Sequence, residues 1–271
     1  NFNPIEFWLV SLNACKNENC IDLELIAVDG ERIKQKNITN IKDQKSAEII
    51  KKSISNEKTI TVKNSKTSDR KMKPKAPFTT ASLQQTAYST LGFSVRQTSS
   101  LAQRLYQGMQ LGGDNVVGLI SYMRTDSTNL SKDCLQDINN FLDSNHPQFK
   151  SEEERKYTKK VKNAQEAHEA IRPTSIDNTP DKVKKCLDEQ EFKLYELIWK
   201  RTVASQMTDA IYNQVTLEFN LSDKYDFRYS GSFLKENGFK EIYNLSENDE
   251  KDKVNKKILE NIKTGDELAI Q

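Results

Sequence analysis

The stretch TTASLQQTAYSTLGFSVRQTSSLAQRLYQG, residues 79–108, marks the change from strand to helix in this chain of 271 residues. It reads as two short helices, each opened by the S-x-x-Q spacing of an N-terminal capping box and each ended by a glycine. A link of about three residues joins them, which is typical of a helix-turn-helix and equally of an αα corner in a helical bundle. The capping pairs and glycines are, in order, Ser82 with Gln85, Gly92, Ser94 with Gln97, and Gly108.

The residues before this helical pair alternate apolar and polar side chains, as strands do. We expect two strands within 6–28 with a turn at 13–20, a short helix at 40–55 and a strand at 59–62. Residues 51–75 carry nine basic and two acidic residues, and Pro74 and Pro77 lie at the end of this stretch and just after it. This composition predicts an exposed linker.

After the helical pair, residues 116–122 are apolar and β-branched, which predicts a buried strand. A helix is expected to begin at Ser131, a second to occupy 163–171 up to Pro173, and a long one to run over 179–207.

Strand patterns return at 215–219 and 226–229, with a hairpin signature around 236–238. We expect residues 246–257 to be mobile and the last strand to lie at 265–271.

The order of elements therefore predicts an α+β fold with a domain inserted into another. A β-rich domain would combine residues 1–75 and 209–271, and a mainly helical domain would occupy 76–208.

The charges nearly balance, with 41 Lys and Arg against 39 Asp and Glu, a net charge of +2. This excludes a uniformly basic protein such as a histone, although local basic patches remain. The sequence contains no run of about 18 apolar residues, so we expect no membrane span, and we expect no secretory signal. The spacing of Cys15 and Cys20 fits no common zinc site, so we expect reduced thiols.

One polar cluster follows the apolar stretch, in GLISYMRTDSTNLS at 118–131. On an extended backbone Tyr122, Arg124 and Asp126 would project to the same side. A tyrosine oxygen can act as a nucleophile, and the fork of an arginine suits the charge of a phosphodiester. The pattern alone favours a core tyrosine with a surface ion pair over this catalytic arrangement.

Here the sequence resembles a known family, the type IA DNA topoisomerases, in their bacterial topoisomerase I branch. GLISYMRTDS at 118–127 resembles the active-site signature of that family. The segment before the signature is similar to PFTTASLQQ at 77–85 and LGFS at 91–94, and AQEAHEAIRP at 164–173 resembles the histidine helix. FRYSG at 227–231 resembles a strand of the arch domain.

The resemblance implies that Tyr122 attacks one DNA strand and becomes a 5′-phosphotyrosine, while Arg124 positions the scissile phosphate. It implies that His168 supports phosphate contacts and proton movement. Asp126 would be a partner of the loop or a DNA contact, and Arg172 either a helix-end cation or a DNA contact. The parent enzyme would relax negatively supercoiled DNA at single-stranded regions, as a monomer of the cytoplasm and nucleoid or of an organelle.

The family also uses Mg²⁺, held by an acidic cluster in a TOPRIM domain, and this sequence shows no such cluster. We therefore expect the chain to be a central piece of a larger enzyme and to have no cleavage activity alone.

Two other functions are compatible with the pattern. A non-catalytic helix-turn-helix at 82–107 would read duplex DNA through Arg96 or Arg104. A purely structural arch would leave all DNA contact to other domains. Lys156 to Lys162 form a basic run that would touch phosphates or lie in a solvated loop.

Overall fold

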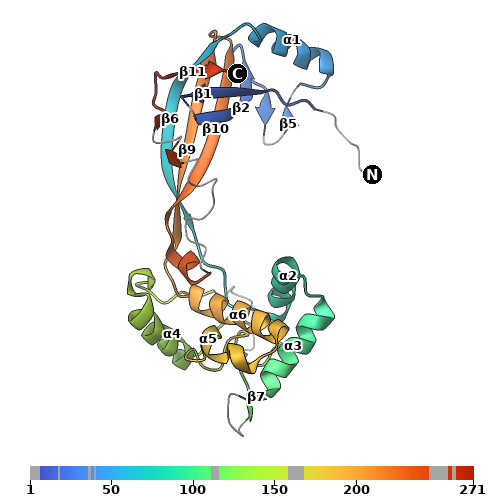
Figure 1. Cartoon of the computed structure of the whole chain (residues 1–271), viewed down its shortest axis with the longest axis vertical. Helices are drawn as coiled ribbons and strands as arrows, with labels where there is room; N and C mark the ends of the chain where they lie inside the picture. The colour runs from blue at the N-terminus through green and yellow to red at the C-terminus, as the bar shows by residue number, and fades with distance from the viewer. Residues whose placement is uncertain are drawn as a thin grey trace, which may run out of the picture. The chain divides into compact units, whose positions relative to one another are not determined.

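The computed structural model describes residues 7–17, 19–35, 38–39, 41–110, 116–157, 168–243, 256–257 and 261–271. The chain divides into two compact units. The first comprises Asn1–Lys71, Ile211–Lys235 and Glu247–Gln271, and the second Met72–Ala210 and Glu236–Ser246. The expected α+β class is confirmed by the order of helices and strands (Figure 1).

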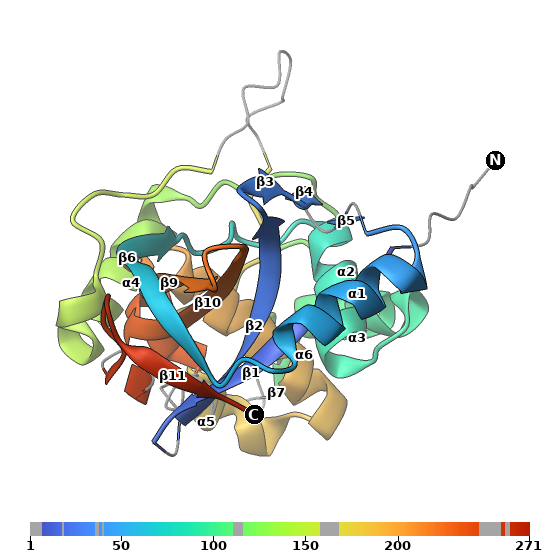
Figure 2. The ribbon, with the colours of Figure 1, turned by 90° about the horizontal axis from the view of Figure 1, so that it is seen from above.

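The first unit is built on a seven-stranded sheet in the order β1-β11-β6-β9-β10-β2-β3. Because β1 also pairs with β2, the sheet closes on itself, and Figure 2 shows β6, β11, β1 and β2 around a common interior. The strands are β1 (Ser11–Lys16), β2 (Asn19–Val28), β3 (Glu31–Arg32), β6 (Thr59–Met72), β9 (Ala210–Leu221), β10 (Tyr225–Glu236) and β11 (Glu267–Ile270).

The interior of this sheet is apolar because strand residues alternate between its faces. Leu23, Leu217, Phe219 and Phe227 are fully buried there. Helix α1 (Gln44–Ile54) begins at the N-cap Asp43 and packs Ile54 against the same cluster. A separate two-stranded pair joins β4 (Lys34–Gln35) to β5 (Ile38–Thr39).

The second unit is mainly helical and has its own apolar core. Its short strand pair joins β7 to β8. The elements are α2 (Thr80–Leu91), α3 (Val95–Gln107), β7 (Met109–Gln110), β8 (Val116–Val117), α4 (Lys132–Asn145), η1 (Pro147–Phe149), α5 (Pro180–Val183), η2 (Lys184–Cys186), α6 (Glu189–Ala204) and η3 (Gly238–Tyr243).

Helix α6 is the centre of the helical unit, in contact with α2, α3, α5 and η3. Its buried face carries Leu194, Tyr195, Ile198 and Val203, none of which has any exposed surface. The 3.6-residue period of these side chains makes one apolar stripe that the other helices cover.

The helical pair of the sequence is confirmed, with a different first cap. Thr79 is the N-cap of α2 and Ser82 occupies N3 of its capping box, rather than starting the helix. Gly92, with φ 71°, takes the left-handed conformation that ends α2. Ser94 caps α3, as expected, by accepting a hydrogen bond from the Gln97 amide.

Three expectations for the strand regions are wrong in extent. Residues 13–16 and 19–20, expected to form a turn, belong to β1 and β2 instead, and the second strand is correspondingly longer. The linker expected at 51–75 contains β6, whose polar side chains face solvent over most of its length. Around 236–238 there is no hairpin, because β10 runs directly into η3.

Two expectations for the helical region are also wrong. Residues 116–122 form a strand only at 116–117, and the long helix of 179–207 is interrupted before Asp188. There Asp188 and Glu191 make a capping box that starts α6 afresh. The helix expected at 163–171 lies largely outside the described residues, and its end at 168–171 is extended rather than helical.

The cysteines differ from expectation as well. Cys15 and Cys20 are direct cross-strand partners in the β1–β2 hairpin and form a disulfide. The hairpin register brings the two thiols together, which their sequence spacing alone does not reveal. Cys134 and Cys186 are free thiols, and burial raises the pKa of the Cys134 thiol to about 11.

Alkylation of the protein should therefore reveal its thiols in three steps. Without reductant, the native protein should react at Cys186, because the raised pKa of buried Cys134 leaves very little thiolate at neutral pH. In the denatured protein without reductant, both free thiols, Cys134 and Cys186, should be alkylated. In the denatured and reduced protein, all four cysteines should be alkylated. Mass spectrometry counts the adducts, and four adducts without reductant would contradict the disulfide.

Candidate active site

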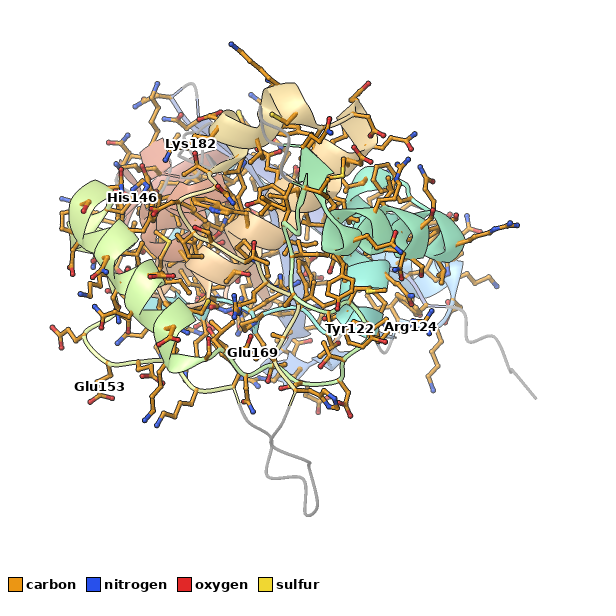
Figure 3. The ribbon with its side chains drawn as sticks, turned by 90° about the horizontal axis from the view of Figure 1, so that it is seen from below. Tyr122, Arg124, His146, Glu153, Glu169 and Lys182 are labelled. Carbon is orange, nitrogen blue, oxygen red and sulfur yellow. A yellow bond between two sulfur atoms is a disulfide. The ribbon has the colours of Figure 1, made fainter. Side chains whose placement is uncertain are left out.

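Tyr122 lies on an irregular segment between β8 and α4. Leu119 and Ile120 are buried just before it, and Met123 is buried just after it. Tyr122 itself is 47% exposed, and Arg124 and Asp126 are exposed too. Figure 3 shows Tyr122 and Arg124 beside each other. The apolar residues fix the backbone in the core while the polar side chains reach solvent.

The segment before Tyr122 pairs with residues 171–174. Ile120 forms an antiparallel bridge with Pro173, flanked by a hydrogen bond from Thr174 N to Leu119 O of 3.0 Å. The Ser121 amide donates to Arg172 O at 2.8 Å. The stretch that resembles a histidine motif is thereby held against the stretch that carries the tyrosine.

The segment after Tyr122 is bound to the beginning of α2. Thr80 N donates to Thr125 O at 2.9 Å, and the Thr80 hydroxyl donates to Met123 O at 2.8 Å. Phe78 O accepts a hydrogen bond of 2.8 Å from Ile171 N. Residues 78–80 therefore connect both neighbouring segments to the core.

His168 is exposed and stands two residues before Ala170. Ala170 has no exposed surface, and its amide donates to Asn129 O at 2.8 Å. This places the backbone of the histidine motif beside the segment that follows Tyr122. The described contacts do not include one between His168 and Tyr122.

Arg172 is held by the protein itself. Its guanidinium donates to Glu169 at 2.9 Å, to Pro173 O at 2.9 Å and to Ser131 Oγ at 3.4 Å. The side chain is 17% exposed. The guanidinium thus joins the histidine motif to Ser131, the N-cap of α4.

Arg124 is different, because within the described part of the chain its guanidinium has no ion pair. It borders a cavity of about 230 Å³ between α2 and α3, whose other lining residues include Gln84, Gln103 and Met123. An exposed, unpaired guanidinium beside Tyr122 is available to a phosphate.

Tyr106 is a neighbour of Tyr122 that sequence reasoning did not find. The two rings meet edge to face with centroids 5.4 Å apart. The Leu119 amide donates to Leu105 O at 2.8 Å, and a Cβ on Gly118 would lie 2.7 Å from Tyr106 O. The glycine that opens the signature therefore permits the close approach that sets one ring against the other.

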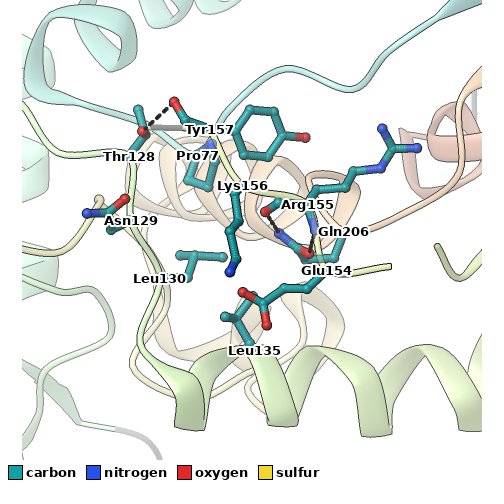
Figure 4. Close-up of a pocket in the computed structure, with 10 residues that line it drawn as sticks. All are labelled: Pro77, Thr128, Asn129, Leu130, Leu135, Glu154, Arg155, Lys156, Tyr157 and Gln206. Atoms are coloured by element: carbon teal, nitrogen blue, oxygen red, sulfur yellow. Dashed lines mark hydrogen bonds between the residues drawn. The ribbon is translucent and has the colours of Figure 1, made fainter. Parts of the chain in front are cut away.

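A second cavity, of about 180 Å³, lies beside the other end of the segment (Figure 4). There the Gln206 amide bonds to both backbone groups of Arg155, at 3.0 and 3.2 Å. Tyr157 donates to Ser205 O at 2.8 Å, and burial raises its pKa to about 12. Tyr157 therefore stays a neutral structural donor. Lys156 borders this cavity, whereas most of the basic run lies outside the described residues.

Comparison with known proteins agrees with this arrangement. The family model described as DNA topoisomerase matches residues 1–271. The chain belongs to the bacterial type IA DNA topoisomerases. The resemblance noted in the sequence is thereby confirmed.

Several relatives match all or nearly all of the chain. DNA topoisomerase 1 of Rickettsia felis is 40% identical over 258 residues, covering 94% of this chain and 33% of the relative. That of Campylobacter jejuni is 37% identical, covering 100% and 36%. The full-length topoisomerase I structure from Thermotoga maritima matches with TM-score 0.72 and 28% identity, covering 96% of this chain and 39% of that one. The chain thus spans about a third of the length of these curated topoisomerases.

The described residues contain no group of three or more His, Cys, Asp or Glu side chains placed to hold a metal ion. The described residues therefore offer no site for the Mg²⁺ ion that the topoisomerase family uses. In the same residues, no helix has the length and apolar character needed to cross a bilayer.

Replacing Arg172 with Lys tests whether this arginine of the topoisomerase motif is structural. Lys cannot reproduce the fork, so the variant should lose about 1–2 kcal/mol of unfolding free energy. Urea denaturation measures this loss. Arg96→Lys, at an exposed position of α3, is the matched control and should be nearly neutral. Unchanged stability with weakened DNA binding would instead identify Arg172 as a DNA contact.

Proposed function

We propose that this chain supplies the strand-cleaving tyrosine of a DNA topoisomerase that relaxes negatively supercoiled DNA. Tyr122 Oη would attack a backbone phosphorus, forming a 5′-phosphotyrosine bond. The bond from phosphorus to the 3′-oxygen would break, and that oxygen would leave with a proton. Religation would be the same reaction in reverse, after another strand has passed.

The observation that carries this proposal is an exposed tyrosine on a fixed backbone beside an unpaired arginine. Arg124 would hold the scissile phosphate and stabilise the charge that gathers on its oxygens. Nothing in the described structure competes for that guanidinium as an ion-pair partner. The family membership of the whole chain supports the same assignment.

The other motif residues take lesser roles. His168, whose imidazole is exposed, would contact the phosphate or move the proton of the leaving group. Asp126, also exposed, would order the DNA-facing loop or contact DNA. Arg172 would contribute chiefly by holding the histidine motif, given its three internal partners.

The substrate would be a single-stranded region of negatively supercoiled duplex, bound by a monomer in the cytoplasm and nucleoid or in an organelle. Residues 76–208 would form the tyrosine domain, and 1–75 with 209–271 the arch. The family's Mg²⁺ would be held by residues other than those described.

A sequence-reading helix-turn-helix is less well supported. Arg104, one of its two candidate readers, is paired with Asp188 at 3.2 Å and with Glu191 at 3.1 Å. These contacts direct its guanidinium at the N-terminus of α6. A base-reading role would require both pairs to break.

Tyr122→Phe in a full-length enzyme that contains this chain tests the proposal. Only the hydroxyl is lost, so relaxation and the covalent DNA adduct should vanish while non-covalent binding of single-stranded DNA stays within about twofold. Gel assays of plasmid relaxation and of labelled adducts measure the first two, and fluorescence anisotropy the third.

Tyr88→Phe is the matched control, because Tyr88 is an exposed tyrosine of α2 at 69%. It should relax DNA like the wild type. Persistent relaxation by the Tyr122 variant would refute the assignment of the nucleophile. Absence of any DNA binding by the wild type would favour a purely structural role for the chain.

A further inference from the structure

Two hydroxyl groups bind the backbone on the two sides of Tyr122. Ser121 precedes the tyrosine, and Thr80 comes from the first turn of α2, 42 positions earlier in the chain. Neither side chain belongs to the polar set that the sequence singled out. Both are part-buried, and both contact main-chain atoms rather than solvent-facing groups.

Ser121 replaces a missing rung of a β-ladder. Around the bridge between Ile120 and Pro173, a regular antiparallel pair would direct the Arg172 amide to the Ser121 carbonyl. Instead Arg172 N donates to Ser121 Oγ at 3.0 Å, and that hydroxyl donates to Ala170 O at 2.6 Å. The Ser121 carbonyl is thereby released from the ladder, and the chain can leave it at Tyr122.

On the C-terminal side of Tyr122, the Thr80 hydroxyl likewise binds main-chain groups. Its Oγ1 accepts a hydrogen bond from Thr125 N at 2.9 Å and donates to Met123 O at 2.8 Å. The Thr80 amide also donates to Thr125 O. Since Thr80 is held in a capped helix, the residues on both sides of Arg124 are fixed to a rigid element.

Together the two hydroxyls determine where the Tyr122 ring and the Arg124 guanidinium stand. Tyr122 lies on an irregular segment without regular strand hydrogen bonds, so the position of its ring depends on the hydrogen bonds of the neighbouring residues. An in-line attack requires the oxygen about 3–3.5 Å from phosphorus, and a misplacement of about 1 Å can cost roughly 100-fold in rate.

We infer that Thr80 and Ser121 are positioning residues for strand cleavage, acting by fixing the backbone of residues 121–125 so that Tyr122 and Arg124 face one phosphate. This inference rests on the proposed function of Tyr122. It assigns the two hydroxyls no contact with DNA. They therefore should affect the rate of cleavage and not the strength of DNA binding.

The test compares variants that lose a hydroxyl with variants that keep it, in a full-length enzyme that contains this chain. Thr80→Val and Ser121→Ala should each slow formation of the covalent adduct on a single-stranded oligonucleotide by about tenfold or more. Thr80→Ser and Ser121→Thr should recover most of the rate. The dissociation constant of the same oligonucleotide should stay within about twofold in all four.

Thr90→Val is the matched control, because it removes a threonine hydroxyl of the same helix that donates to a carbonyl, Thr86 O at 2.7 Å, within the helix itself. It should cleave at the wild-type rate. Thermal unfolding of each variant sets an assay temperature well below every midpoint, so that a loss of rate cannot come from unfolded protein.

Wild-type rates in the hydroxyl-free variants would overturn the inference. Equal losses in the hydroxyl-keeping variants, or a loss of DNA binding that accounts for the loss of rate, would overturn it as well. Failure of the proposed function is a separate result, since wild-type enzyme would then form no adduct or Tyr122→Phe would still form one.

Discussion

The backbone of residues 119–125 must satisfy its polar groups without belonging to a helix or a regular strand. This constraint governs the helical unit, because unpaired N–H and C=O groups next to a core cost as much as a lost hydrogen bond. The partners come from three directions: Leu105 at the end of α3, residues 172–174, and Thr80 at the start of α2. The elements that supply these partners must in turn hold their own positions.

Helix α6 provides that support. The Arg201 guanidinium lies over the ring of Phe78 at 4.5 Å and donates to Ala76 O at 2.7 Å. Burial lowers the pKa of Arg201, and the attraction of the Tyr243 oxygen, to which the guanidinium donates a hydrogen bond, works against that shift. Phe78 in turn accepts from Ile171, which adjoins the bridge beside Ser121. A continuous set of contacts thus joins the core helix to both segments that flank Tyr122.

The sequence predicted what local chemistry determines. Gly92, Ser94 and Gly108 end or begin helices because caps act within one turn, and the structure has them in those positions. Local signals also compete, and there the prediction was less accurate. The apolar periodicity predicted one continuous helix over 179–207, but the capping box of Asp188 and Glu191 starts a new helix within that range.

Elements that depend on distant partners could not be predicted in this way. The strand predicted at 59–62 is only the beginning of β6; the rest of β6 is almost entirely exposed and polar, so its strand character comes from pairing rather than from alternation. The disulfide of Cys15 and Cys20 depends on hairpin register. In the candidate site, Tyr122 and Arg124 were predicted from their motif, whereas the contacts of Tyr106, Thr80 and Ser121 with this segment could not be predicted from any sequence spacing.

An irregular segment suits a nucleophile for a physical reason. In a sheet with both faces covered the Tyr122 ring would be buried, and in a helix its backbone groups would be fixed by neighbours four residues away. Here the buried side chains of Ile120 and Met123 anchor the chain on both sides of an exposed ring. The hydroxyls of Ser121 and Thr80 make the backbone hydrogen bonds that a neighbouring strand would otherwise supply. Rigidity and access are thus obtained from the same few residues.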